Sequence, residues 1–189
     1  KQLRELKSTA GGELQGLILD LRNNPGGVLG GAVSVSDSFL DSGLIVYTEG
    51  RVKDSELEFT AKPPDLLQGA PLIVLINEGS ASASEIVAGA LQDRGRALVM
   101  GLQSFGKGSV QTILPMNNKT ALKLTTARYY TPSGRSIQAE GIVPDIVVNK
   151  LKLDVRQSDT EAVKEAHLQG HLKNADAEDD AKSQRDGKV

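Results

Sequence analysis

The chain has 189 residues and a formal net charge of −2, and no basic segment is interleaved with aromatic residues, which argues against nucleic acid as a partner. It contains no cysteine, so a disulfide framework, a cysteine nucleophile and a cysteine zinc site are excluded. No run of about 18 apolar residues predicts a membrane span. The chain starts at Lys1 rather than at a methionine, and we expect it to be a piece of a longer protein.

Strands and helices alternate along the first half of the chain, as judged from apolar periodicity and from Gly, Pro and Asn punctuation. In chain order, the predicted elements are a helix at 3–6, a strand at 16–21, a helix at 28–39, strands at 44–48 and 71–76, a helix from residue 84 to near Gly95, and a strand at 97–100. Strands that alternate with helices over short connections predict an α/β layered core.

Three of these segments carry further expectations. The strand at 16–21 is apolar on both faces, which is typical of a buried strand in a parallel sheet. The helix at 28–39 presents the stripe Val28, Ala32, Val35 and Phe39, which we expect to face the core. The stretch 49–68 is charged and contains two adjacent prolines, which predicts a surface segment with one edge strand.

The pattern changes in the second half of the chain. Residues 110–114 and 122–128 alternate apolar with polar side chains across a turn at 117–120, which predicts a β-hairpin. A last short strand is predicted within residues 141–148.

The composition then becomes charged and polar. Ser158 and Glu161 have the spacing of a capping box and predict a helix, followed by an acidic segment that is short of apolar residues. We therefore expect a core at residues 1–149 and a helical, partly disordered C-terminal arm at 150–189.

The predicted strand at 71–76 leads into a turn of small residues, 77–85, and then into a helix. A serine on such a turn is exposed, and the amides at the start of a helix point outward, where they can hold an oxyanion. Ser82 is therefore a candidate nucleophile, with Ser80 and Ser84 as alternatives on the same turn.

A catalytic triad would need a histidine, but both histidines, His167 and His171, belong to the predicted arm, where we expect them to be solvated. Their spacing could suit a metal ion. No glutamate follows His167 and no third ligand is apparent, so we expect neither a metal nor another cofactor.

Lys107, which is flanked by Gly106 and Gly108, is the candidate general base. An amine accepts a proton only when it is neutral, so a catalytic lysine needs an apolar environment that disfavours the charged form. We expect the neighbouring Phe105 and Val110 to help provide it.

Two other motif matches in this region are weak. Residues 101–107 match the first seven positions of a P-loop, but Gly108 stands where a Ser or Thr should bind magnesium, and residues 109–114 predict a strand where a helix is required. Residues 104–107 also match the S-x-x-K motif of penicillin-binding proteins. The glycines beside Lys107 disfavour the helical turn that this motif needs, and its partner motifs are absent.

Four stretches of the sequence, in order, resemble the signatures of the carboxyl-terminal processing proteases, which are tail-specific serine peptidases with a Ser-Lys dyad. They are LDLRNNPGG at 19–27, GSASASE at 79–85, SFGKGSVQ at 104–111 and YTPSGRSIQ at 130–138. The resemblance covers about residues 1–149. It implies a ClpP/crotonase-like α/β fold with an appended β-hairpin, and endopeptidase cleavage of protein or peptide substrates near their exposed C-termini.

The resemblance also implies roles for individual residues. Ser82 matches the family nucleophile, Lys107 the general base and Gln111 the residue that orients the lysine. The oxyanion hole would be formed by the backbone amides of Ala83 and of one glycine, either Gly26 or Gly27.

Family members usually carry a PDZ domain that captures the substrate C-terminus, and its position would be upstream of Lys1. The resemblance further implies export to the periplasm or an equivalent space, an activating adaptor as a candidate partner, and homo-oligomer assembly to which the arm could contribute. Two alternatives stay open: a crotonase-like acyl-CoA enzyme, which would not need Ser82, and a non-catalytic interaction module.

Overall fold

The computed structural model describes residues 2–51, 56–117 and 119–148. The chain divides into two units at residue 150, and the described residues belong to the first. The arm predicted at 150–189, with its capped helix and both histidines, lies outside them. No helix in the described ranges is both long and apolar enough to cross a membrane.

Three helices and eight strands make up the described residues. In chain order they are α1 (Gln2–Thr9), β1 (Leu17–Asp20), α2 (Leu29–Asp37), β2 (Gly43–Gly50), β3 (Leu57–Ala61), β4 (Leu72–Ile76), α3 (Ala83–Asp93), β5 (Leu98–Gly101), β6 (Ser109–Pro115), β7 (Ala121–Tyr130) and β8 (Ile146–Val147). Each predicted helix and strand of this region is present, including the hairpin of β6 and β7, with shifts at the element ends that are largest for β8.

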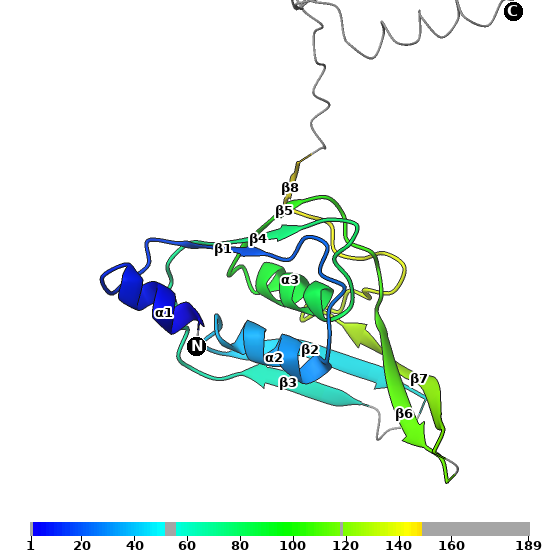
Figure 1. Cartoon of the computed structure of the whole chain (residues 1–189). Coiled ribbons are helices and arrows are strands. Elements are labelled where there is room, and N and C mark those ends of the chain that lie inside the picture. The colour runs from blue at the N-terminus through cyan, green and yellow to red at the C-terminus, as the bar shows by residue number, and fades with distance from the viewer. Residues whose placement is uncertain (1, 52–55, 118, 149–189) are drawn as a thin grey trace, which may run out of the picture. The chain divides into compact units, whose positions relative to one another are not determined.

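The strands form two sheets with the helices α2 and α3 between them (Figure 1). One sheet is parallel, in the order β1-β4-β5-β8, and the other is antiparallel, in the order β3-β2-β7-β6. Helix α3 contacts both β5 and β2, while α2 contacts β2 and β3. This arrangement confirms the α/β layered core, and β3 is the edge strand predicted within 49–68.

Helix α3 is the central element of the core. Every residue from Ala83 to Leu91 is buried, because the helix has a sheet on either side. Strand β4 presents Leu72, Val74 and Ile76 to the helices, each no more than 3% exposed. The turn with the serines joins β4 to α3 and is therefore anchored at both ends by deeply buried elements.

Two expectations about burial are wrong. Strand β1 is not buried on both faces: Ile18 is 63% exposed, because no described helix covers the outer face of the parallel sheet. In the stripe predicted for the helix at 28–39, Ala32 is buried in the core, but Val28, just before α2, is 78% exposed and Val35 of α2 is 40% exposed. These two valines line a surface hollow instead.

Candidate active site

Ser82 stands at the junction of β4 and α3, immediately before the first helical residue, Ala83. Its backbone has φ 57° and ψ −115°, a positive-φ conformation outside the left-handed helical region that residues other than glycine rarely adopt. Such strain costs about 1–3 kcal/mol and is found mainly at functional sites, where the surrounding contacts enforce it. Ser82 is half-buried, whereas Ser80 and Ser84 are 0% and 4% exposed, so Ser82 is the serine of this turn that a substrate can reach.

The hydroxyl of Ser80 holds the turn together. It donates a hydrogen bond to the Leu21 carbonyl at 2.7 Å and accepts one from the Asn77 amide at 3.0 Å. The carbonyl of Ser80 accepts a hydrogen bond from the Phe105 amide at 3.0 Å. Ser80 therefore connects the end of β1, the serine turn and the loop that carries Lys107.

Gly26 packs against the backbone of the serine turn. A Cβ atom on Gly26 would lie 2.4 Å from the Ala81 carbonyl oxygen and 2.6 Å from the Ala83 nitrogen, and φ here is +92°, so the position requires glycine. The Gly26 amide donates to the side-chain oxygen of Asn24 at 3.0 Å. Gly26 thus provides the close approach of the two loops, while its own amide is occupied.

Two other backbone amides lie unpaired beside Ser82. Among the described residues, no hydrogen-bond acceptor meets the amide of Gly27 or that of Ala83. Both residues line the same hollow. Of the two glycines that the sequence left open, Gly27 is therefore the one whose amide can stabilise an oxyanion together with Ala83.

One side chain, that of Glu85, joins the two halves of the candidate dyad. It is fully buried and accepts four hydrogen bonds, which is the full acceptor capacity of a carboxylate. Its donors are the amides of Ser82 at 2.7 Å, Lys107 at 2.9 Å and Gly106 at 2.6 Å, and the hydroxyl of Ser104 at 2.6 Å. The Ser82 and Lys107 amides share a single oxygen, Oε2, which fixes the two backbones relative to each other.

Sequence reasoning gave Glu85 no role, although a local signal for it exists. Ser82 and Glu85 have the S-x-x-E spacing of a capping box, in which the glutamate at the third helical position accepts from the amide of the N-cap residue. That half of the box is present at 2.7 Å. The predicted helix start at residue 84 hides the spacing, because α3 begins one residue earlier, at Ala83.

Lys107 is half-buried in the loop between β5 and β6. Within the described parts of the chain, its ammonium group makes no hydrogen bond or ion pair. The expectation that Phe105 shields it is wrong here, because Phe105 is 68% exposed, whereas Val110 packs against the core. Strand β6 begins at Ser109, so no helix follows the lysine and the loop lacks the helix N-terminus of a P-loop.

Gln111 is exposed on β6, opposite Thr125 of β7. No hydrogen bond between its side-chain amide and Lys107 is found in the described residues. The register of the hairpin shifts between Val110 and Gln111, and a bulge of this kind redirects side chains. The structure thus links the backbones of Ser82 and Lys107 through Glu85, but in the described residues it shows no hydrogen bond from Gln111 to the lysine.

An apolar hollow of about 230 Å³ opens beside Gly27 and Ala83. Most of its wall consists of aliphatic side chains from α2, α3 and the loops before them: Leu21, Val28, Ala32, Val35 and Val87. The exposure of Val28 and Val35 is explained by this hollow. A side chain bound here would be in apolar surroundings next to the two unpaired amides.

Charged groups near the glycine loop are paired with each other. Arg22 donates to Asp20 from Nε at 2.9 Å and from its terminal nitrogen at 2.7 Å. These hydrogen bonds lower the pKa of Asp20 and raise the pKa of Arg22. Both side chains are about half exposed, so the pair contributes little to stability. No group of three metal-binding side chains is found in the described ranges.

Acyl transfer requires an accessible nucleophile, donors for an oxyanion and a nearby base. The candidate site offers Ser82, two unpaired amides beside it, and Lys107, whose backbone amide is bound to Glu85 as that of Ser82 is. Phosphoryl transfer would need a phosphate-binding loop, and the backbone after Lys107 does not form one. The geometry therefore favours attack by a serine on a carbonyl carbon.

The sequence was compared with protein families and with individual proteins. The model of peptidase family S41 matches residues 1–148. A carboxy-terminal-processing protease from Bartonella bacilliformis is 55% identical over 167 residues, which cover 88% of this chain and 38% of that protein. The chloroplastic carboxyl-terminal-processing peptidase 3 of Arabidopsis thaliana is 45% identical over 140 residues, which cover 71% of this chain and 26% of that protein.

Solved structures give the same result. The photosystem II D1 C-terminal processing protease matches with a TM-score of 0.68 and 36% identity, over 77% of this chain and 36% of its own. Mature CPAF matches with a TM-score of 0.62 at 15% identity, which shows the shared fold alone. The chain spans well under half the length of the relatives it matches. The resemblance found in the sequence is confirmed, and the chain belongs to peptidase family S41.

Proposed function

We propose that the protein is a serine endopeptidase that cleaves protein substrates near their C-termini, with Ser82 as nucleophile and Lys107 as general base. The observation that supports this most directly is the shared Oε2 atom of Glu85, which accepts from the Ser82 and Lys107 amides at 2.7 and 2.9 Å. The C-terminal substrate class is supported by the names of the similar proteins, which are carboxyl-terminal processing proteases.

In this mechanism the hydroxyl oxygen of Ser82 attacks the carbonyl carbon of the scissile peptide bond while the neutral amine of Lys107 takes its proton. The N–H groups of Gly27 and Ala83 stabilise the negative charge that forms on the carbonyl oxygen. The C–N bond then breaks, and the lysine gives its proton to the leaving amine. Water then attacks the ester carbon on Ser82 and loses a proton to the lysine. The C–O bond to Ser82 breaks, and the lysine returns its proton to the serine oxygen, which restores the neutral amine.

The hollow beside Gly27 and Ala83 supports a preference at the residue that forms the acyl group. Its walls are aliphatic and its volume is about 230 Å³, which suits a small or medium-sized apolar side chain. A charged side chain there would lose its hydration without gaining a partner. Peptides that differ only at this residue should therefore differ in kcat/KM.

We also propose, from the family resemblance, that the protein acts outside the cytoplasm and that it works with partners. Capture of the substrate C-terminus, assembly with further copies and activation by an adaptor would then involve regions beyond the described residues. Cell fractionation checks the location outside the cytoplasm. The mass of the complete protein in solution, measured alone and with a candidate adaptor, checks assembly.

A serine-reactive phosphonate on an apolar peptide tests the proposed chemistry in the complete protein. The label is expected on Ser82, with no label in Ser82→Ala and strongly reduced labelling in Lys107→Ala. Loss of the nucleophile should lower kcat by about 10⁴-fold or more. Labelling of Ser80 or Ser84, or undiminished cleavage by Ser82→Ala, would reject the assignment.

The same variants separate the alternatives. A crotonase-like acyl-CoA enzyme predicts binding of coenzyme A and no effect of Ser82→Ala. A non-catalytic interaction module predicts no phosphonate label at all in the unmodified protein.

A further inference from the structure

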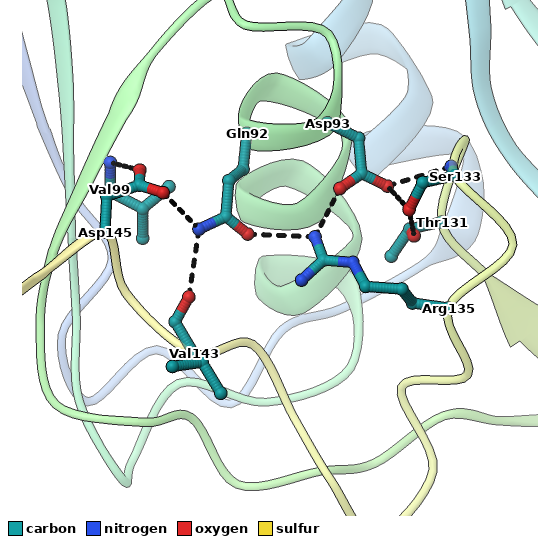
Figure 2. A network of polar contacts seen from close by, with 8 residues as sticks. All are labelled: Gln92, Asp93, Val99, Thr131, Ser133, Arg135, Val143 and Asp145. Carbon is teal, nitrogen blue, oxygen red and sulfur yellow. Dashed lines mark hydrogen bonds and ion pairs between the residues drawn. The ribbon is translucent and has the colours of Figure 1, made fainter.

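The last turn of α3 holds the segment that follows β7. The carboxylate of Asp93, which is 7% exposed, accepts from the amide of Ser133 at 2.9 Å and from its hydroxyl at 2.6 Å (Figure 2). Its other oxygen is paired with the guanidinium of Arg135. The same guanidinium nitrogen donates to the side-chain oxygen of Gln92 at 2.9 Å, so two neighbouring helix residues hold one arginine.

Gln92 also holds the far end of this segment. Its side-chain nitrogen donates to the Val143 carbonyl and to the Asp145 carboxylate, each at 2.9 Å. The other oxygen of Asp145 accepts from the Val99 amide of β5 at 2.8 Å. Residues 131–145 are thus attached at both ends to α3, as the dashed lines of Figure 2 show.

The middle of residues 131–145 is hydrogen-bonded to the loop that carries Lys107. The amide of Ala139 donates to the Gly106 carbonyl at 2.8 Å, and the amide of Gly108 donates to the side-chain oxygen of Gln138 at 3.1 Å. These two contacts lie on either side of Lys107.

The backbones of this loop and of residues 131–145 also pack closely against each other. A Cβ on Gly108 would lie 2.4 Å from the nitrogen of Gln138, and one on Gly106 would lie 3.0 Å from the carbonyl carbon of Ala139. On the opposite side the segment rests on α3, where a Cβ on Gly89 would lie 2.8 Å from the Thr131 side chain. The glycines therefore let helix, segment and loop approach one another directly.

From these contacts we infer that Asp93 and Arg135 are positioning residues for Lys107, acting through residues 131–145. This inference rests on the proposed function, because it assigns a role in placing the base. Helix α3 carries Ser82 before its first residue and Asp93 as its last. One rigid helix thus sets the nucleophile directly and sets the loop of the base through the segment attached to its other end.

Neither Asp93 nor Arg135 contacts the loop of Lys107 itself among the described residues. Their removal should therefore leave the substrate-binding hollow and the serine turn in place while loosening the loop. Small misplacements of a catalytic group can lower a rate by about 10²-fold without changing substrate binding. The expected signature is a fall in kcat at nearly constant KM.

The test uses Asp93→Asn and Arg135→Met in the complete protein, with Asp65→Asn as matched control. Asp65 is 5% exposed and pairs with Arg96 at 3.0 Å, so it is an equally buried ion-pair carboxylate. In the described ranges its carboxylate bonds to Leu67, Gly69 and Arg96, none of which belongs to residues 131–145. We expect kcat to fall about 10- to 100-fold in the first two variants, with KM almost constant. Asp65→Asn should lose thermal stability without this fall.

Two further readouts separate positioning from general stability. The pH at which kcat rises to half of its maximum should change in Asp93→Asn and Arg135→Met but not in Asp65→Asn. Amide hydrogen exchange across residues 104–108 should rise in the same two variants, because the Gly106 and Lys107 amides are hydrogen-bonded in the intact loop. This exchange measurement does not depend on activity.

Gln138→Ala provides a milder variant if Asp93→Asn does not fold. Gln138 is exposed, and among the described residues the change removes one side-chain hydrogen bond, that from the Gly108 amide. It should raise exchange at residues 104–108 and lower kcat in the same direction. The inference is overturned if Asp93→Asn, or Gln138→Ala in its place, keeps both the kcat and the loop exchange of the unmodified protein. An unmodified protein that neither cleaves nor labels would instead reject the proposed function, while the exchange result would still decide the link from Asp93 to the loop.

Discussion

Asn23 and Asn77 hold each other across the two loops that form the candidate site. The backbone amide of Asn23 donates to the side-chain oxygen of Asn77 at 2.8 Å. In return, the side-chain nitrogen of Asn77 donates to the side-chain oxygen of Asn23 at 3.0 Å. Asn23 has φ 56°, a left-handed conformation that asparagine tolerates better than most residues. The loop with Gly26 and Gly27 is thereby fixed to the turn with Ser82.

Asn77→Ala should misalign these loops. It removes the two bonds to Asn23 and a third to the Gly79 amide at 3.0 Å. We expect kcat to fall about 10- to 100-fold and the free energy of unfolding to fall by about 1–3 kcal/mol. Steady-state kinetics and urea unfolding measure the two effects. Thr126→Val is the control, because it removes a 2.9 Å bond to Thr112 on the hairpin, and an equal loss of kcat there would contradict the prediction.

Gly26→Ala should lower the free energy of unfolding much more than Gly27→Ala does. A Cβ on Gly26 would overlap the backbone of Ala81 and Ala83 at a positive φ, whereas a Cβ on Gly27 would meet nothing within 4 Å. Strain and overpacking should cost Gly26→Ala about 1–3 kcal/mol or more. Thermal unfolding of the two variants compares them directly. A Gly26→Ala protein as stable as Gly27→Ala would show that the two loops do not pack as described.

Glu85→Gln should impair activity more than its small change in size suggests. Glutamine has one acceptor oxygen, and its NH₂ group would face either the amides of Ser82 and Lys107 or the amide of Gly106 and the hydroxyl of Ser104, all of which now donate to the carboxylate. We expect kcat to fall about 100-fold, since both halves of the dyad lose their common support. Phosphonate labelling of Ser82 reports the loss. The exposed Glu58 of β3 offers the matched control, and Glu58→Gln should label at the normal rate.

Asp93 should make stability depend on pH in acid. Burial raises the pKa of Asp93, but hydrogen bonds from Ser133 and Thr131 and the charge of Arg135 outweigh this, so the pKa is lowered overall. A carboxyl group with a lowered folded-state pKa stabilises the protein above its unfolded-state pKa, about 3.9. That stabilisation is lost as the pH falls through the folded-state value.

Urea unfolding at a series of pH values from neutral to strongly acid checks this prediction. Asp93→Asn should be less stable at neutral pH and should show a flatter acid dependence than the unmodified protein. Asp20→Asn should change the curve less, because Asp20 and Arg22 are about half exposed and screened by solvent. A curve for Asp93→Asn parallel to that of the unmodified protein would contradict the assignment.

The elements of this fold could be predicted because their signals are local. Strand β4 and helix α3 follow from apolar periodicity, and the hairpin follows from alternation around a turn. Periodicity does not reveal what an apolar face meets. Val28 and Val35 fit the helical stripe of α2 as well as Ala32 does, yet they line a hollow rather than the core.

The sequence named a set of candidate site residues but not the contacts between them. Which glycine can serve the oxyanion depends on the Asn24 side chain, which occupies the amide of Gly26. The carboxylate of Glu85 meets a loop about 20 residues away, and Asp93 meets Ser133, about 40 residues away. No local pattern states which distant loop a side chain will reach, so these roles required the structure.

Glu85 and Ser80, which hold the Lys107 loop from one side, precede it in the chain, whereas its contacts with Gln138 and Ala139 come after it. A protein emerges from the ribosome N-terminus first, at about 5–20 residues per second. Ser82 and Lys107 are therefore made before Gln138 and Ala139, which hold the loop in place. Under the proposed function, a nascent chain therefore reaches full activity only once synthesis has passed Asp145 and residues 131–145 have docked on α3. If the proposed function holds, the order of synthesis alone delays full cleavage activity until residues 131–145 are in place.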